Sequence, residues 1–180
     1  MQTLVDPLKR ALQIRAKEVA VIDGEKAFTY DELWARCSQL VGALRNLGSV
    51  KGDRIAILSN NSHQYFEAYM GIPAGGMVIV PLNTRHALPE LLYALEDSGA
   101  KILLTDRSDI GPLQGSVDQV ISLDEEYEAV LAGAAQAPLG DDADEEDLAG
   151  LFYTGGTTGA SKGVMLTHRN LIANAFNWLS

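Results

Sequence analysis

Apolar residues along this chain form two kinds of pattern, short continuous runs and stripes with helical spacing. The runs are too short for helices and have the length of strands buried on both faces of a sheet. They predict strands at 55–58, 77–81 and 102–104, with one more at 117–121. Residues 19–22 and 26–28 predict two further strands joined by a turn at Asp23-Gly24.

Between the runs, apolar residues recur three or four positions apart, which is the spacing of one helix face. The clearest stripe predicts a helix that begins after Thr29, where Thr29 and Glu32 form a capping box, and stops at Gly48. Its inward-facing residues are predicted to be Leu33, Cys37, Leu40, Leu44 and Leu47.

Four more helices are expected within residues 1–137. The first begins with Asp6 as the N-cap and Pro7 in the first turn. Others cover 62–72, run from Pro89 to Gly99, and start near Asp124. This alternation of strands and helices predicts an α/β fold, with a parallel or mostly parallel sheet and helices on both faces.

The last quarter of the chain divides into two segments after an N-terminal α/β region at 1–137. Residues 138–147 are polar and acidic and predict a linker, and 148–180 contain a glycine-rich loop, its strand and a following helix. That helix has no capping residue at Ser180, so we expect a truncated fragment. Its apolar side, which includes Trp178, leads us to expect self-association.

Charge and composition exclude several classes of protein. The chain has 180 residues and a net charge of −10, whereas a nucleic-acid binder needs a basic surface. The acidic residues at 141–147 are interpreted as a solvated spacer. The single cysteine, Cys37, excludes an internal disulfide and is interpreted as a core thiol. We therefore expect a cytoplasmic setting.

No segment predicts a membrane span. The longest uncharged stretch, 68–83, is shorter than the roughly 20 residues that a helix needs to cross a bilayer, and Pro73 and Pro81 interrupt it. Contact with a membrane surface stays open. Asp6 and Pro7 interrupt the N-terminus before an apolar run forms, so no signal peptide is expected.

The segment 153–163, YTGGTTGASKG, is the most informative in the chain. It holds four glycines, three threonines and one lysine. Glycine lets backbone N–H groups approach an anion closely, and threonine and lysine add hydroxyl and ammonium donors. These properties predict a loop that binds polyphosphate. The alternative is a turn between two strands without a ligand.

Two common nucleotide-binding patterns do not fit this segment. A Walker A loop needs glycine before the lysine and serine or threonine after it, whereas Lys162 stands between Ser161 and Gly163. The dinucleotide pattern G-x-G-x-x-G is also absent here.

The segment resembles the signature loop of the adenylate-forming enzymes, which include acyl-CoA synthetases, luciferases and peptide-synthetase adenylation domains. Ser161 departs from the family's usual proline, so φ is not fixed there and a hydroxyl is added. Two weaker segments, 28–33 and 75–83, also resemble the family. The run 81–85 favours acyl-CoA synthetases over peptide-synthetase domains.

The resemblance implies an acid–thiol ligase that uses ATP, Mg²⁺ and CoA. A carboxylic acid, expected to be a fatty acid, would be activated as an acyl-adenylate and passed to CoA. The family's catalytic residues and ribose contacts are expected beyond Ser180, so this chain holds no catalytic residue and should be inactive alone. The alternatives are a non-catalytic interaction module and an adenylating enzyme with a carrier-protein acceptor.

The resemblance also assigns the binding residues. Backbone N–H groups of the glycines, threonine hydroxyls and the Lys162 ammonium would hold the β- and γ-phosphates, and Thr157 would touch Mg²⁺. The predicted binding residues are Thr154, Gly155, Gly156, Thr157, Thr158, Gly159, Ser161 and Lys162.

Other candidate residues favour structural roles. His63, His86 and His168 lack the spacing of a metal site. We interpret His168 as a capping or surface residue at a helix start, with a place near the substrate as the alternative. The aromatic and methionine residues at 65–70 have the spacing of ordinary core packing.

Overall fold

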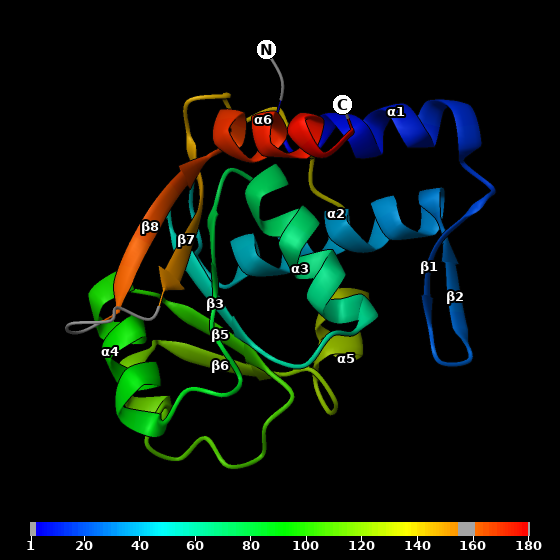
Figure 1. Ribbon diagram of the computed structural model, residues 1–180. Helices are drawn as coiled ribbons and strands as arrows, with labels where there is room; N and C mark the ends of the chain where they lie inside the picture. The colour runs from blue at the N-terminus through cyan, green and yellow to red at the C-terminus, as the bar shows by residue number, and fades with distance from the viewer. Residues whose placement is uncertain (1–2, 155–160, 180) are drawn as a thin grey trace.

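The protein is an α/β domain built on a six-stranded sheet, with a separate two-stranded hairpin (Figure 1). The computed structural model describes residues 3–154 and 161–179. The strands are β1 (Val19–Asp23), β2 (Lys26–Thr29), β3 (Arg54–Leu58), β4 (Val78–Pro81), β5 (Ile102–Thr105), β6 (Gln119–Ser122), β7 (Leu148–Thr154) and β8 (Lys162–Thr167). The helices are α1 (Asp6–Arg15), α2 (Tyr30–Asn46), α3 (His63–Ala74), α4 (Leu88–Ser98), α5 (Tyr127–Ala132), α6 (His168–Leu179) and the 3₁₀ turn η1 (Gln114–Ser116).

The large sheet is mostly parallel, as the sequence predicted. Its strand order is β6-β5-β3-β4-β7-β8. Pairing is parallel from β6 to β7, and β8 alone runs antiparallel, against β7. The sequence did not predict this antiparallel edge, because a short apolar run indicates a strand but not its direction.

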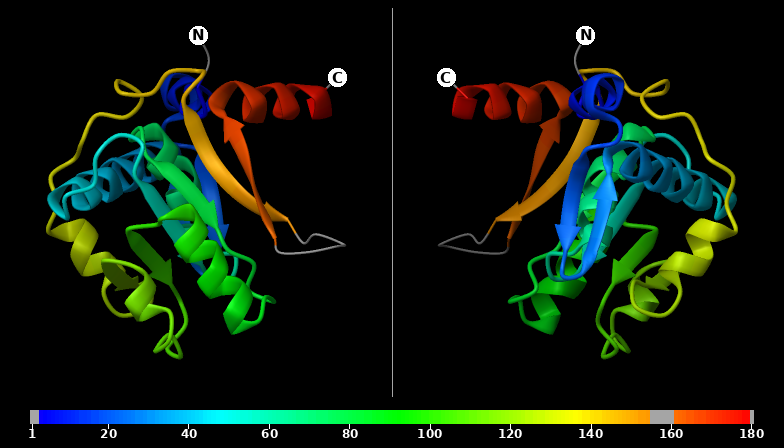
Figure 2. Two further views of the ribbon diagram at one scale, coloured as in Figure 1. Left: turned by 90° about the vertical axis from the view of Figure 1, so that its left-hand side faces the viewer. Right: turned by 90° about the vertical axis from the view of Figure 1, so that its right-hand side faces the viewer.

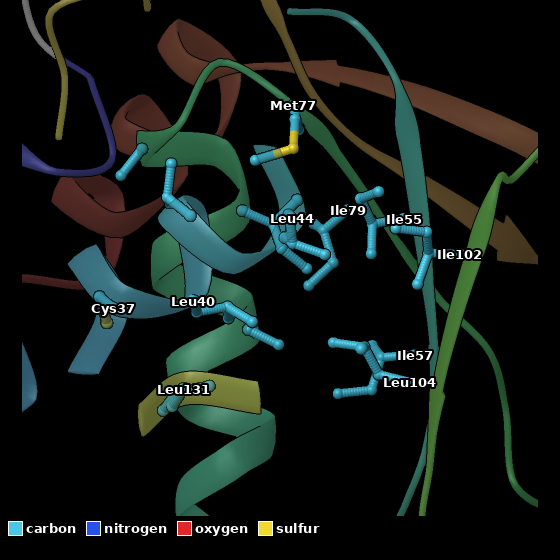
Figure 3. Close-up of a cluster of buried hydrophobic side chains, with 14 of the residues drawn as sticks. Cys37, Leu40, Leu44, Ile55, Ile57, Met77, Ile79, Ile102, Leu104 and Leu131 are labelled. Atoms are coloured by element: carbon cyan, nitrogen blue, oxygen red, sulfur yellow. The ribbon is translucent and has the colours of Figure 1, made fainter. Parts of the chain in front are cut away.

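Side-chain alternation along the central strands gives each face of the sheet its own core. On β3, Ile55 and Ile57 belong to one buried cluster, while Ala56 and Leu58 belong to the other. Successive side chains of a strand point to opposite faces, so a continuous apolar run serves both. Figure 3 shows the first cluster, where side chains of α2, among them Leu44, lie against the sheet.

The two clusters are covered by different helices. Buried residues of α2, α3 and α5 complete the first cluster, and buried residues of α4 complete the second. Figures 1 and 2 show α4 on the opposite side of the sheet from α2 and α5. Helices on both faces are therefore confirmed.

Two predicted core residues lie at the surface. The stripe of α2 is buried as far as Leu44, but Leu47 follows the last helical turn and is 39% exposed. Phe66 of α3 is 40% exposed, whereas Tyr65, Tyr69 and Met70 pack partly buried against the first cluster. Cys37 is confirmed as a core thiol, and burial raises its pKa.

Several element boundaries differ from the predicted ones by a few residues, and three of them have a clear local cause. Helix α1 begins at Asp6 itself, because Val5 is the N-cap. Strand β1 continues through Asp23, and the turn follows it at Gly24, where φ is +59°. Helix α5 begins at Tyr127 rather than near Asp124, because 122–126 form a turn closed by Glu126, whose side chain accepts from the Ser122 N–H.

The acidic segment forms ion pairs with the rest of the domain, and its paired carboxylates remain partly exposed to solvent. Asp142 pairs with Arg45 at 2.6 Å, and Asp147 pairs with Lys51 at 2.7 Å. Arg169 of α6 pairs with both Glu145 and Glu146. The division of the chain at 138 and 148 stays a prediction.

Among the described residues, no helix is long and apolar enough to cross a bilayer.

Candidate phosphate-binding site

The glycine-rich segment joins the two antiparallel strands β7 and β8. Their pairing continues to the last position, where Thr154 is opposite Lys162 and Tyr153 is opposite Gly163. Thr154 and Lys162 are both exposed. A hydroxyl and an ammonium group therefore flank the segment from the two strand ends. Figure 2 shows these strands extending together away from the helical layers.

The ring of Tyr153 lies against the backbone of β8. A Cβ atom added at Gly163 would meet Tyr153 Cζ at 3.2 Å and the hydroxyl oxygen at 3.3 Å. These distances are tighter than ordinary van der Waals contacts. The glycine that follows Lys162 therefore allows the tyrosine ring to approach the opposite strand closely.

Helix α4 contacts the same tyrosine. The Tyr153 hydroxyl donates a hydrogen bond of 2.6 Å to Oδ2 of Asp97, and the Tyr93 ring lies edge-on to the Tyr153 ring at 6.4 Å between centroids. Burial and the Asp97 carboxylate raise the pKa of Tyr153 well above its ordinary value. The hydroxyl therefore remains a donor at neutral pH.

The structure describes only part of the predicted site. Thr154, Ser161 and Lys162 are described, and Ser161 is half-buried directly before β8. The other predicted binding residues, Gly155, Gly156, Thr157, Thr158 and Gly159, lie outside the described residues, and so does the predicted Mg²⁺ contact at Thr157. Across 3–154 and 161–179, no group of three or more His, Cys, Asp or Glu side chains could hold a metal ion.

Comparison with known proteins identifies the family. Residues 8–180 match the family described as AMP-binding enzyme, which is nearly the whole chain. The chain belongs to the AMP-binding enzyme family. Its glycine-rich segment between β7 and β8 lies inside the matched region.

Individual members of this AMP-binding family are similar over most of the chain. A feruloyl-CoA synthase from an Amycolatopsis species is 38% identical, over 96% of this chain and 35% of the relative. A fatty acid–[acyl-carrier-protein] ligase from Streptomyces coeruleorubidus is 31% identical, over 96% of this chain and 34% of the relative. The chain therefore spans about a third of the length of these curated relatives.

A solved member has the same fold. The crystal structure of ATP-bound MatB from Rhodopseudomonas palustris superimposes with a TM-score of 0.88 and 31% sequence identity. The similarity covers 98% of this chain and 37% of that protein. The α/β arrangement described above is thus that of an AMP-binding enzyme.

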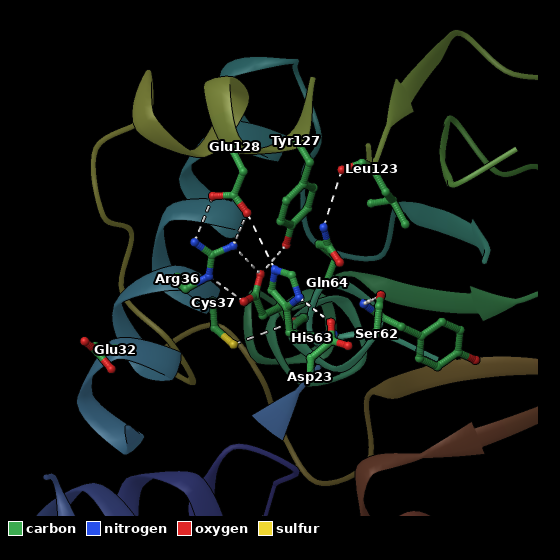
Figure 4. A network of polar contacts seen from close by, with 12 residues as sticks. Asp23, Glu32, Arg36, Cys37, Ser62, His63, Gln64, Leu123, Tyr127 and Glu128 are labelled. Carbon is green, nitrogen blue, oxygen red and sulfur yellow. Dashed lines mark hydrogen bonds and ion pairs between the residues drawn. The ribbon is translucent and has the colours of Figure 1, made fainter. Parts of the chain in front are cut away.

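This AMP-binding chain also contains a buried polar network that the sequence did not predict (Figure 4). Arg36 of α2 donates to Glu67 of α3 and forms a two-point contact of 2.7 and 2.9 Å with Glu128 of α5. Glu67 is fully buried and also accepts 2.8 Å from the Tyr127 hydroxyl. Burial would lower the pKa of Arg36, but hydrogen bonds to Glu128 and Glu67 raise it overall.

His63 extends this network to the β1–β2 hairpin. Its Nδ1 lies 2.6 Å from Oδ2 of Asp23, and the same oxygen accepts from the His63 backbone N–H at 3.0 Å. The imidazole stacks on Phe28, with the centroids 4.9 Å apart. These residues hold α3 to the hairpin, so we assign the network to the fold rather than to phosphate binding.

The surface interpretation of His168 was wrong. This first residue of α6 is fully buried, and its Nδ1 accepts from the Leu4 N–H at 3.1 Å. Thr167 caps the helix instead, since its hydroxyl accepts from the Asn170 N–H. Sequence could not indicate this contact, because 164 positions separate Leu4 from His168.

Proposed function

We propose that this chain is the N-terminal part of an ATP-dependent acyl-CoA synthetase, and that its β7–β8 loop holds the β- and γ-phosphates of ATP. The supporting observation is the pairing of Thr154 with Lys162 at the two ends of a glycine- and threonine-rich segment. Membership of the AMP-binding family and the similarity to an ATP-bound relative agree with it.

The proposed reaction has two steps. A carboxylate oxygen of the acid attacks the α-phosphorus of ATP, the bond from that phosphorus to the β-phosphate bridge oxygen breaks, and pyrophosphate leaves. The CoA thiol then loses its proton to solvent, its sulfur attacks the acyl carbon, and AMP departs with the shared oxygen. Mg²⁺ would neutralise phosphate charge when bound.

In this proposal, Lys162 stabilises the charge that accumulates on the departing pyrophosphate. Preorganised donors at a site of developing charge contribute roughly 3–4 kcal/mol for one essential group. Lys162 is paired with Thr154 across the two strands, so the pairing sets the spacing of these two residues before ATP arrives. The hydroxyl of Thr154 on the opposite strand would donate to the same triphosphate.

The test is ATP–pyrophosphate exchange by the full-length protein. Lys162→Ala should slow acid-dependent exchange at least tenfold, which corresponds to about 1.4 kcal/mol or more of barrier. Lys26→Ala is the matched control, because Lys26 is an exposed lysine on the separate hairpin. An unchanged exchange rate in Lys162→Ala would remove the lysine from its proposed role.

A carrier protein is the second candidate acceptor. The relative from Streptomyces coeruleorubidus is named a fatty acid–[acyl-carrier-protein] ligase, so this family can pass an acid to a protein-bound thiol. An assay of the full-length protein with CoA and with a phosphopantetheinylated carrier protein would distinguish the two candidate acceptors. Thioester on CoA alone supports the synthetase, and thioester on the carrier alone favours the alternative.

The acid itself is part of the proposal. We propose a carboxylic acid of the fatty-acid class, used in a cytoplasmic setting. The feruloyl-CoA synthase is named for an aromatic acid, so a panel must contain both aliphatic and aromatic acids. CoA-dependent AMP release with aliphatic acids supports the fatty-acid class, and release with aromatic acids alone would contradict it.

A further inference from the structure

We propose that Asp97 of α4 is a positioning residue for the phosphate loop: it holds Tyr153, and through Tyr153 it fixes the strand ends that carry Thr154 and Lys162. This inference rests on the proposed function, since it assigns Asp97 a part in binding ATP. Asp97 contacts neither Thr154 nor Lys162 in any hydrogen bond of the described residues. Its carboxylate accepts from the Tyr153 hydroxyl of β7 and, at the longer distance of 3.5 Å, from the Tyr93 hydroxyl of its own helix.

The main chain gives the loop end of β7 little support from the rest of the sheet. Among the described residues, β7 pairs with β4 at one position, Gly150 opposite Ile79. Three residues lie between Gly150 and Thr154. Beyond Gly150, the partner of β7 is β8, which is itself the edge of the sheet. The two strands could therefore move together relative to β4.

Side chains supply the missing support. The hydrogen bond of 2.6 Å from Tyr153 to Asp97 links β7 to α4 at the residue directly before Thr154. The ring of Tyr153 also lies against Gly163, directly after Lys162. One tyrosine thus contacts both strands next to the two flanking donors, and Asp97 fixes that tyrosine to the helix.

The chemistry of the pair suits a fixed contact. A hydrogen bond to a carboxylate is stronger than one between neutral groups. Tyr93 restricts the Tyr153 ring from the side, at 6.4 Å between centroids. Phe152 points to the other face, edge-on to Tyr69 of α3, so β7 is held from both layers near its loop end.

The experiment measures ATP–pyrophosphate exchange by the full-length protein with Asp97→Ala, Tyr153→Phe and both together. Each single variant should raise the KM for ATP about three- to tenfold, the effect of one lost hydrogen bond, while the KM for the acid stays unchanged. The double variant should be no worse than either single one, because both remove the same contact.

A conservative replacement separates positioning from general damage. Asp97→Asn keeps a side-chain oxygen that accepts from the tyrosine hydroxyl, so it should restore most of the affinity for ATP. Glu96→Ala is the matched control, because Glu96 is the neighbouring exposed acid on α4 and should leave both KM values unchanged.

Several results would overturn the inference. Equal losses in Asp97→Asn and Asp97→Ala would do so, and so would a lower kcat with an unchanged KM for ATP. If Lys162→Ala slows exchange but Asp97→Ala and Tyr153→Phe do not change the KM for ATP, the proposed function stands and this inference fails. If the unaltered full-length protein shows no acid-dependent exchange, the proposed function fails first.

Discussion

At the scale of single residues, His168 illustrates how far a side chain's environment depends on distant sequence. Its ring accepts from the Leu4 N–H, so the proton of the neutral ring is on Nε2, which has no hydrogen-bond partner among the described residues. Burial lowers the pKa of His168, although Asp147, Asp6 and Asp144 act in the opposite direction.

This environment predicts a pH-dependent stability. Because the folded-state pKa lies below the unfolded value of about 6.5, the unfolded chain binds the extra proton first. The contribution of neutral His168 to the free energy of unfolding is fully present above the unfolded pKa. It is lost as the pH falls below the unfolded pKa and towards the folded pKa. His168→Asn keeps an acceptor for Leu4 but cannot titrate. It should lose less stability than the unaltered chain between pH 7 and pH 5 in urea unfolding.

An identical loss of stability in the His168→Asn variant over that pH range would contradict this account.

The sequence predicted that His168 stands at a helix start, but it could not show which residues bury the ring. Cys37 is the opposite case. Its burial follows from its position in a stripe of one helix, a local pattern that the sequence contains.

At the scale of elements, the Arg36 network holds three helices in one arrangement. Arg36 lies on α2, Glu67 on α3 and Glu128 on α5, so their ion pairs join the three helices. The Glu67 carboxylate is fully buried, so its charge is tolerated only while Arg36 and the Tyr127 hydroxyl contact it.

Removing the arginine should therefore be costly. Arg36→Ala leaves Glu67 buried without its cation, and breaking such a pair costs about 3–5 kcal/mol of unfolding free energy. Arg15→Ala is the matched control, because Arg15 pairs with Glu18 on the surface and such pairs contribute about 0–1 kcal/mol. Urea denaturation of both variants measures the two unfolding free energies. Equal losses of unfolding free energy would show that the buried pair contributes no more than the surface pair.

Elements differ in how well the sequence predicted them. The capping box of Thr29 and Glu32 and the αL residue Gly99 are local signals, and the helices α2 and α4 begin and end where those signals stand. The antiparallel direction of β8 depends on pairing across the loop. The Arg36 contacts join residues 31 and 92 positions apart, so no local pattern could predict them.

At the scale of the whole molecule, β3 and β5 are buried in the two core clusters, whereas no described strand pairs with the outer edge of β8. Met165 of β8 is 67% exposed, Val164 is 40% exposed, and Phe176 of α6 is 55% exposed. Contiguous exposed apolar patches larger than a few hundred Å² mark interaction surfaces. Self-association of the isolated chain stays a prediction, and the side chain of Trp178 lies outside the described residues.

Sequence predicted one part of the candidate site and missed another. Sequence alone gave the segment from Thr154 to Lys162, because its glycines, threonines and lysine are consecutive in the chain. It could not give Asp97 or the role of Tyr153, because their contact spans 56 positions and depends on where α4 packs. The central claim concerns that segment, namely that it binds the triphosphate of ATP.

The most direct test is a crystal structure of the full-length protein with ATP. We predict that the β- and γ-phosphate oxygens lie about 2.7–3.2 Å from Nζ of Lys162 and the hydroxyl of Thr154. A triphosphate bound elsewhere, with residues 154–162 making no contact to it, would contradict the account.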